Sequence, residues 1–271
     1  MESALLIIAG FIIGSFGTLI GAGGGFILVP LLLIFYPQLG PELTTAISIA
    51  VVAVNAISGT AAYAKSGRID YRAGLTFAAF TIPGSILGVM TVKYIPTEVF
   101  NIVFGILLIT LSIYLFFKNK KNSVTQVYSN AQGLKTHTLV DTMGNTYYYS
   151  YKQDIGNAIS VIVGFISPLL GIGGGIIHVP AMVNWLKFPV HIATATSHFI
   201  LAVMATVSVL THAFNGTYAH PESLHMILFL SLGVVPGAQL GAYFSHRLKS
   251  HIILRVLAGC LILVGIRILV C

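Results

Sequence analysis

Residues 21–30 read GAGGGFILVP and interrupt an otherwise apolar run near the start of the chain. Each glycine costs about 1 kcal/mol relative to alanine in a helix interior. Four glycines within five residues should therefore break a helix here. In hydrocarbon, backbone outside a helix is tolerated only where protein or a polar cavity surrounds it. We therefore expect this loop to present free N–H groups to a partner inside the protein.

The same pattern returns as GIGGGIIHVP at residues 171–180, at an offset of 150 residues. Two corresponding apolar segments broken by glycine and proline point to the binding site of a transporter. The N-terminus of a half-helix carries unpaired N–H groups and a partial positive charge, so a small anion is the expected ligand. The alternative is that the glycines only allow helices to cross closely.

The composition is that of a multi-pass membrane protein. Of 271 residues, 56% are hydrophobic and 8% are charged, which excludes an ordinary soluble domain. The net charge of +7 fits a positive-inside bias better than nucleic-acid binding. We expect the apolar start to be a first membrane segment, not a removed signal peptide. Cys260 and Cys271 lie too far apart in one helix to pair.

Shorter matches follow the glycine loops. Thr45-Ala46-x-Ser48 recurs as Thr194-Ala195-x-Ser197, and Pro83-Gly84-x-x-x-Gly88 recurs as Pro236-Gly237-x-x-x-Gly241. Their offsets of 149 and 153 residues differ little from that of the loops, as a duplication with small loop insertions should give. We predict two membrane repeats, residues 1–117 and 155–271. Each should contain a glycine-broken helix hairpin, which spans or re-enters, and three spanning helices.

Residues 118–154 separate the predicted repeats and are polar. Side chains alternate from Thr136 to Tyr151, and Met143-Gly144-Asn145 offers a turn, so we predict a small extramembrane insert, possibly a β-hairpin. The tyrosines at 147–149 favour strand packing over ligand binding.

Charge sets the expected orientation. The loop at 65–72 and the turn at 246–251 are basic, as is the insert, whereas the loop at 213–223 has no lysine or arginine. With basic loops cytoplasmic, the insert lies inside, both termini lie outside, and the two repeats are inverted in the plasma (inner) membrane.

A small polar stripe follows the first loop. Thr45, Ser48, Val52, Asn55 and Gly59 recur at spacings of three and four residues, so they share one helix face. We expect this face to turn away from lipid, where neutral donors can hold an anion without burying an unpaired cation. Serine and threonine can equally bond back to a carbonyl of their own helix.

Histidines mark only the second half. His178 lies three residues past its glycine loop, and His198 follows Ser197. An intramembrane histidine is a proton relay, a ligand donor or a structural residue, so proton coupling stays open, with His178 favoured by its position. The predicted substrate-binding residues are Gly21, Gly23, Gly24, Gly25, Thr45, Ser48, Asn55, Gly171, Gly173, Gly174, Gly175, His178, Thr194, Ser197 and His198.

Other chemistries lack a signature. The sequence has no P-loop and no H-E-x-x-H motif, so we expect no ATP hydrolysis, no cofactor, no metal site and no catalytic residue. Apart from Glu42 at a helix end, no acidic residue is expected within the membrane, which argues against a sodium or metal-cation carrier.

The paired glycine loops, the Thr-Ala-x-Ser pairs and the Pro-Gly-x-x-x-Gly pairs together resemble the TauE/SafE family of sulfite exporters. The resemblance covers both membrane halves but not residues 118–154. It implies a bacterial or archaeal inner-membrane permease, a secondary carrier of sulfur-containing anions such as sulfite or organosulfonates. The motifs do not fix the substrate.

The sequence thus favours a secondary transporter of small sulfur-containing anions, which works by alternating access around the two glycine loops and exports its cargo. Its partners would be a small anion and the lipid bilayer, not nucleic acid. Three alternatives stay open: a permease for another small organic or inorganic anion, a channel, and a membrane enzyme or receptor that works through the insert.

Overall fold

The computed structural model describes residues 2–118, 134–219 and 221–245, with the isolated positions 247, 258–259, 262–263 and 265 beyond them. Within these residues, six helices are long and apolar enough to cross a membrane. They are α1 (Glu2–Ile20), α3 (Gly40–Lys65), α4 (Tyr71–Val92), α6 (Gln153–Leu170), α8 (Val190–Phe214) and α9 (Pro221–Ser245). A further helix, α5 (Thr97–Lys118), precedes the insert. The predicted helical membrane class is confirmed.

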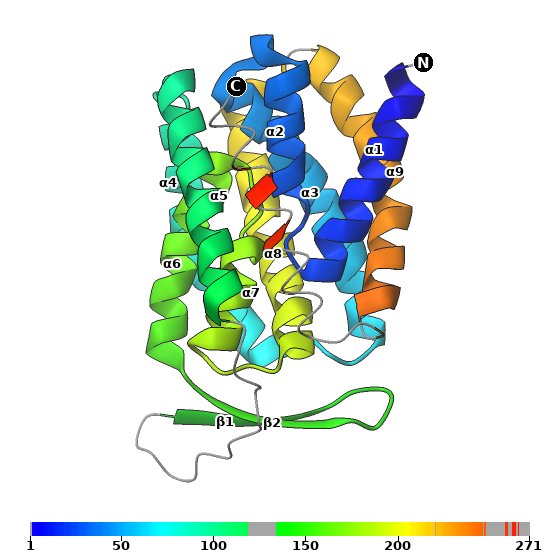
Figure 1. Cartoon of the computed structure of the whole chain (residues 1–271), viewed down its shortest axis with the longest axis vertical. Coiled ribbons are helices and arrows are strands. Elements are labelled where there is room, and N and C mark those ends of the chain that lie inside the picture. Colours follow the sequence, from blue (N-terminus) through cyan, green and yellow to red (C-terminus); the bar gives the residue numbers. More distant parts are fainter. Residues whose placement is uncertain are drawn as a thin grey trace.

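Two short helices start at the glycine loops. Helices α2 (Gly25–Phe35) and α7 (Gly175–Asn184) have 11 and 10 residues. At 1.5 Å per residue each is about 16 Å long, roughly half of a hydrocarbon core of about 30 Å. Figure 1 shows α2 returning to the side where α1 begins, and α7 returning toward the β-hairpin. Both glycine-broken helix hairpins therefore exist, and the short second helix of each turns back toward the side from which the first helix came.

Long helices pack in three pairs: α1 on α9, α4 on α6, and α3 on α8 in the middle. Glycine lets the outer pairs approach closely. A Cβ at Gly14 would lie 2.7 Å from the carbonyl oxygen of Val234, and one at Gly164 would collide with the carbonyl oxygen of Thr81. Such backbone-to-backbone contact between small residues is the usual source of helix association in lipid.

The insert contains an antiparallel β-hairpin below the helices in Figure 1. Strand β1 (Leu134–Val140) pairs with β2 (Thr146–Lys152). The Asp141 carboxylate accepts the N–H groups of Met143 and Asn145 at 2.9 and 2.8 Å. Burial alone would raise the pKa of Asp141, but its hydrogen bonds, led by those from Asn145, hold that pKa below its ordinary value. The predicted hairpin and its turn are confirmed.

Tyrosines of β2 join the hairpin to the helices. Tyr149 and Tyr151 are buried, and their ring centroids lie 4.6 and 4.9 Å from that of Phe188 in the loop after α7. Aromatic contacts of this kind stabilise a packed interface. Of the run 147–149, predicted to serve packing or an interfacial aromatic cluster, Tyr149 packs in such a cluster.

Short 3-10 helices, η1 (Pro37–Leu39) and η2 (Thr217–Ala219), precede α3 and follow α8. The predicted third spanning helix of the second repeat lies mostly outside the described residues, together with Cys260, Cys271 and residues 119–133 of the insert.

Candidate functional site

The two glycine loops lie against each other at the centre of the bundle. A Cβ added to Gly25 would collide with the carbonyl oxygen of Gly171, and one added to Gly175 would collide with that of Gly21. All the glycines of both loops are buried. We call this contact between residues 21–25 and 171–175 the loop crossing.

The central helices hold the loop crossing through reciprocal hydrogen bonds. Ser48 of α3 donates its hydroxyl to the carbonyl oxygen of Gly171 at 2.7 Å. Ser197 of α8 donates to the carbonyl oxygen of Gly21 at 3.4 Å. Each central helix is therefore bonded to the glycine loop of the other half, and the sequence-predicted residues Ser48 and Ser197 are brought together here.

Backbone conformation explains most of the loop glycines. Gly21, Gly23 and Gly24 have φ of +80°, +81° and +85°, and Gly171 and Gly173 have +65° and +72°. This left-handed region is expensive for any residue with a Cβ. Gly174 differs, because its φ is −55°.

Both half-helices begin at the loop crossing without a cap. Gly24 and Gly174 are the N-cap residues of α2 and α7, and neither helix has a side-chain cap. The first N–H groups of a helix have no partner within it and carry its partial positive charge. Two such helix ends therefore meet in the interior of the protein.

Asn55 ties the first loop to its surroundings. Its amide donates to the carbonyl oxygen of Gly23 at 2.9 Å, and its side-chain oxygen accepts the Thr18 hydroxyl at 2.9 Å. The Nε2 of His198 lies 3.3 Å from the same hydroxyl. Tyr63 donates its hydroxyl to the carbonyl oxygen of Thr18 at 2.7 Å. All four side chains are fully buried, so this is a closed polar network in an apolar interior.

Sequence reasoning found Asn55 and His198 but missed Thr18 and Tyr63. Thr18 is a polar residue in an apolar run, three positions before Gly21. Its position next to the glycine loop could have indicated a polar contact there. Tyr63 lies four positions after Gly59 and continues the polar stripe of α3 by one step. The stripe itself is buried along its length, from Thr45 to Gly59, as predicted.

Three predicted residues have their side-chain bonds elsewhere. Thr45 donates to the carbonyl oxygen of Glu42 at 3.0 Å and Thr194 to that of Val190 at 2.8 Å, so both bond back to their own helices. The Nε2 of His178 lies 3.1 Å from the Ser160 hydroxyl. Ser160 lies about 16 Å along α6 from the loop crossing at 1.5 Å per residue. The His178 ring is thus bonded toward α6, although the backbone N–H of His178 donates to the Gly174 carbonyl oxygen at 2.8 Å.

Two buried polar atoms near the loops lack a partner within the described part of the chain. They are Nδ1 of His198 and the hydroxyl of Ser167. His198 adjoins Ser197, which bonds Gly21, and the carbonyl of Ser167 accepts the N–H of Ile172 at 3.2 Å. A buried polar group without a partner costs about 1–3 kcal/mol, so these atoms indicate a place where a polar ligand would be stabilised.

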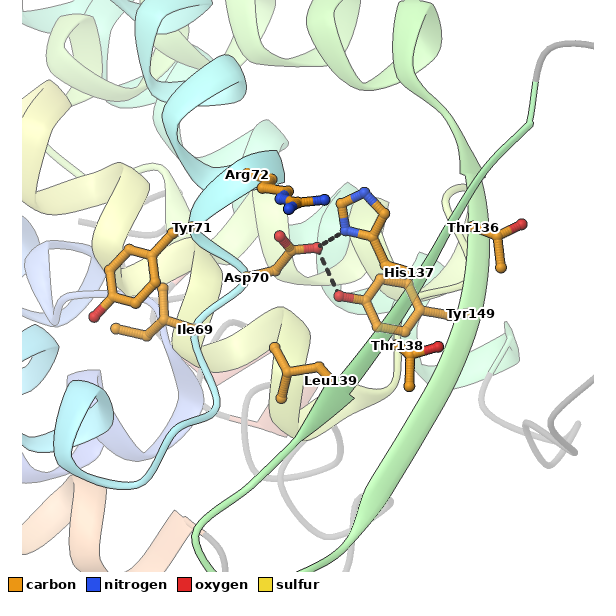
Figure 2. Close-up of a pocket in the computed structure, with 9 residues that line it drawn as sticks. All are labelled: Ile69, Asp70, Tyr71, Arg72, Thr136, His137, Thr138, Leu139 and Tyr149. Atoms are coloured by element: carbon orange, nitrogen blue, oxygen red, sulfur yellow. Dashed lines mark hydrogen bonds and ion pairs between the residues drawn. The ribbon is translucent and has the colours of Figure 1, made fainter.

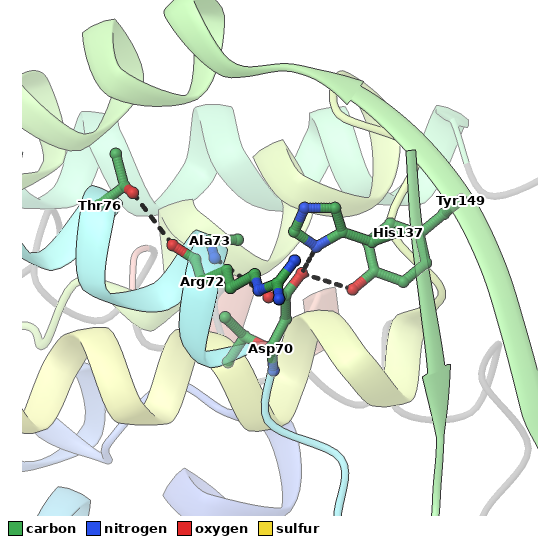
Figure 3. Close-up of polar contacts among 7 residues, drawn as sticks. Asp70, Arg72, Ala73, Thr76, His137 and Tyr149 are labelled. Carbon is green, nitrogen blue, oxygen red and sulfur yellow. Dashed lines mark hydrogen bonds and ion pairs between the residues drawn. The ribbon is translucent and has the colours of Figure 1, made fainter. Parts of the chain in front are cut away.

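A second polar cluster joins the hairpin to the helices (Figure 3). Asp70, the N-cap of α4, accepts a hydrogen bond from Tyr149 at 2.6 Å and pairs with Nδ1 of His137 at 2.7 Å. Its N–H donates to the Thr196 hydroxyl of α8 at 3.0 Å. Burial, and then the charge of Asp70, raise the pKa of Tyr149 well above its ordinary value. Sequence analysis missed this cluster because its members are far apart in the chain.

Beside Asp70 lies a cavity of about 430 Å³ between β1 and the start of α4. Figure 2 shows the Arg72 guanidinium next to the His137 ring at its edge. In the part of the chain that the structure describes, no group of three or more histidine, cysteine or acidic residues is placed to hold a metal ion.

Comparisons with known proteins give one matching family model and several relatives that are probable membrane transporters. A family model described as sulfite exporter TauE/SafE matches residues 6–268. The probable membrane transporter protein YunE of Bacillus subtilis is 32% identical, over 98% of this chain and 96% of its own length. A probable membrane transporter protein of Methanocaldococcus jannaschii is 26% identical, over 97% and 93%. No solved structure gives a significant match.

Proposed function

Because this chain belongs to the TauE/SafE sulfite exporter family and is a multi-pass membrane transporter, we propose that its cargo is a small sulfur-containing anion, sulfite or an organosulfonate. The anion binds at the loop crossing, in contact with the first N–H groups of α2 and α7. Transport is export by a secondary carrier.

The observation that carries this proposal is the meeting of two uncapped helix N-termini in a buried place. Helix N-termini favour anions through their N–H groups and their dipole. The Nδ1 of His198, the residue after Ser197, and the hydroxyl of Ser167, in the last turn of α6, have no partner within the described residues. A cation would find no carboxylate among these groups, whereas an oxyanion would find donors on more than one side.

Reciprocal contacts support two inverted repeats, residues 1–117 and 155–271. Ser48 bonds the second loop as Ser197 bonds the first. A Cβ at Gly84 would lie 2.5 Å from the carbonyl oxygen of Val161, and one at Gly237 would collide with that of Phe11. These contacts correspond at the offsets found in the sequence. Repeats of this kind alternate access by rocking one half against the other around a fixed site.

Charge supports an orientation with the hairpin in the cytoplasm. Thr142 of the hairpin donates its N–H to the carbonyl oxygen of Ser66 at 3.2 Å, so the basic loop at 65–72 and the insert lie on one side. Lys65, Arg68, Arg72, Lys135 and Lys152 gather there. The positive-inside rule then puts this side in the cytoplasm and both termini outside the inner membrane.

The test is uptake of radiolabelled sulfite into proteoliposomes, with unlabelled sulfate, taurine, sulfoacetate and acetate as competitors. We expect saturable uptake that one sulfur anion suppresses and acetate does not. Flux that rises linearly with concentration would identify a channel instead. Absence of both uptake and competition in a correctly folded protein would rule out a sulfur-anion carrier.

A further inference from the structure

Within the residues that the structure describes, Arg68 is a buried cation without an ion pair. It follows the end of α3 and is 5% exposed. Its Nε donates to the Ser66 hydroxyl at 3.0 Å, and its guanidinium carbon lies 5.6 Å from the centroid of the Tyr63 ring. Its Nη1 is buried and has no acceptor within the described residues. Burying a charge is costly unless it is paired and hydrogen-bonded.

Nearby carboxylates are already occupied. Asp141 accepts hydrogen bonds from Met143, Asn145 and Tyr147. Asp70 accepts bonds from Ala73, His137 and Tyr149. The structure gives Arg68 no ion pair with any residue that it describes. The guanidinium therefore keeps free donors for an anion that is not part of the chain.

Arg68 stands at one end of the polar network of the loop crossing. Its guanidinium faces Tyr63, which bonds the carbonyl oxygen of Thr18, whose hydroxyl bonds Asn55. Asn55 in turn bonds Gly23 of the first loop. One cation–ring contact followed by buried hydrogen bonds therefore leads from the hairpin side to the loop crossing.

The opposite end of α3 carries the opposite charge. Thr217 donates to the Glu42 carboxylate at 3.2 Å, and Nδ1 of His212 lies 3.4 Å from the Thr217 hydroxyl. The Arg68 end also holds Asp70 and Asp141, but Lys65, Arg68, Arg72, Lys135 and Lys152 outnumber them. An anion is therefore attracted to this side on balance and repelled by Glu42 on the other. The difference favours loading of an anion from the hairpin side, which is the direction that export requires.

We propose that Arg68 forms a second anion site on the hairpin side, which holds the oxyanion of the cargo before it reaches the loop crossing. The planar guanidinium matches an oxyanion with two parallel N–H groups. The hairpin turn covers this site, because the N–H and hydroxyl of Thr142 both bond the Ser66 carbonyl oxygen at 3.2 Å. Separation of Thr142 from Ser66 admits the anion. This inference rests on the proposed function.

The first test compares the KM for sulfite from each side of the membrane, in right-side-out and inverted vesicles. We expect Arg68→Gln to raise the KM on the hairpin side by at least about tenfold, the loss of one charge-assisted pair, and to leave the KM on the other side within about twofold. Arg68→Lys keeps the charge and should lose less. The matched control is Arg72→Gln, a neighbouring exposed arginine, which should behave as wild type. An unchanged KM in Arg68→Gln, or an equal loss in Arg72→Gln, would overturn the proposal.

A second test does not need transport. Melting temperatures of the purified protein are measured with and without sulfite, and with sulfate as a second oxyanion. We expect anion-dependent stabilisation that Arg68→Gln reduces and Arg72→Gln keeps. If Arg68→Gln lowers stability equally with and without anions, Arg68 is only structural and the inference fails. If the anion stabilises through Arg68 but wild-type vesicles take up no sulfite, the proposed function fails and the anion site stands.

Discussion

At the scale of single residues, Asn55 connects the first glycine loop to the buried polar network around Thr18. It joins the Thr18 hydroxyl to the Gly23 carbonyl within the membrane interior. An amide is suited to this place because it both donates and accepts. Removing it takes the side-chain donor from the Gly23 carbonyl and leaves the Thr18 hydroxyl with only His198 as a side-chain partner.

We expect Asn55→Ala to lower the free energy of unfolding by about 1–3 kcal/mol, the cost of leaving a buried polar partner unpaired, and to reduce sulfite uptake. Thermal unfolding and proteoliposome uptake measure the two effects. The control is Asn184→Ala, since the Asn184 amide bonds only the Pro180 carbonyl oxygen of its own helix. Equal losses in both variants would contradict a special role for Asn55.

The loop glycines should differ in their tolerance of alanine. Gly24 has a φ of +85°, and a Cβ there would lie 2.9 Å from the carbonyl oxygen of Ile13. At Gly174 a Cβ would meet only side-chain ends, Val163 at 2.8 Å and Met204 at 3.2 Å. A left-handed residue with a Cβ costs about 1–2 kcal/mol before any clash. We expect Gly24→Ala to lose more stability and uptake than Gly174→Ala.

The matched control for Gly24 is Gly216→Ala. Gly216 has a φ of +75° with nothing within 4 Å of an added Cβ, so it shares the backbone cost without the clash. In thermal unfolding, we expect Gly24→Ala to be less stable than Gly216→Ala. The reverse order would show that the close packing of the first loop contributes little.

At the residue level, the sequence alone was enough to predict those residues that stand out in a local sequence pattern. The glycines, Ser48, Asn55 and Ser197 were predicted because they recur at a helical spacing or at the repeat offset, and His198 because it is an intramembrane histidine next to Ser197. Whether Thr45 and Thr194 bond a ligand or their own helix was left open, since both bonds suit a threonine in a helix. Arg68 looked like an ordinary loop charge, because its burial depends on the hairpin packed over it.

At the scale of elements, the β-hairpin is joined to the membrane helices by Asp70. This carboxylate caps α4, bonds β1 through His137 and bonds β2 through Tyr149 (Figure 3). One side chain therefore fixes the position of both strands relative to α4.

Tyr149→Phe removes one hydrogen bond to a buried carboxylate, so we expect a loss of about 1.5–3 kcal/mol near neutral pH. Burial and Asp70 raise the pKa of Tyr149 above its ordinary 10.0 in the folded state. The stability due to neutral Tyr149 is therefore fully present below pH 10 and is lost as the pH rises beyond it. Melting temperatures between pH 8 and 11 should fall less steeply for Tyr149→Phe than for wild type.

The control for this element is Tyr148→Phe, because Tyr148 is 51% exposed on the other face of β2. It should keep both the wild-type stability near neutral pH and the wild-type alkaline profile. If Tyr148→Phe flattens the profile as much as Tyr149→Phe does, the hairpin is not held through Tyr149.

Helices and the hairpin turn were predictable because their signals are local: apolar length, glycine breaks and alternation. The pairing of α1 with α9 and of α4 with α6 was not, although the glycines at their contacts were visible. A stripe of small residues indicates that a helix packs closely against another helix, but it does not identify that helix. The direction in which α2 and α7 turn back also depended on the tertiary arrangement.

At the scale of the whole molecule, the proposed orientation requires that the hairpin and the α8–α9 connection lie on opposite sides of the membrane. Met143 in the hairpin turn is 67% exposed, and Phe214 at the end of α8 is 89% exposed. With Cys260 and Cys271 replaced by serine, an impermeant maleimide should label Phe214→Cys in intact cells. It should label Met143→Cys only in inverted vesicles. The opposite pattern would reverse the proposed orientation and the loading side of Arg68.

We propose that the anion binds where the two glycine loops cross. The most direct test of this site is to locate a bound anion in the protein. Selenite, the selenium counterpart of sulfite, can be located by anomalous scattering in crystals of the purified protein. We predict an anomalous peak at the loop crossing, from a selenite whose oxygens lie about 2.7–3.2 Å from the first N–H groups of α2 and α7. The proposed site would be contradicted if selenite inhibits sulfite uptake but its anomalous peak lies elsewhere in the protein and not at the loop crossing.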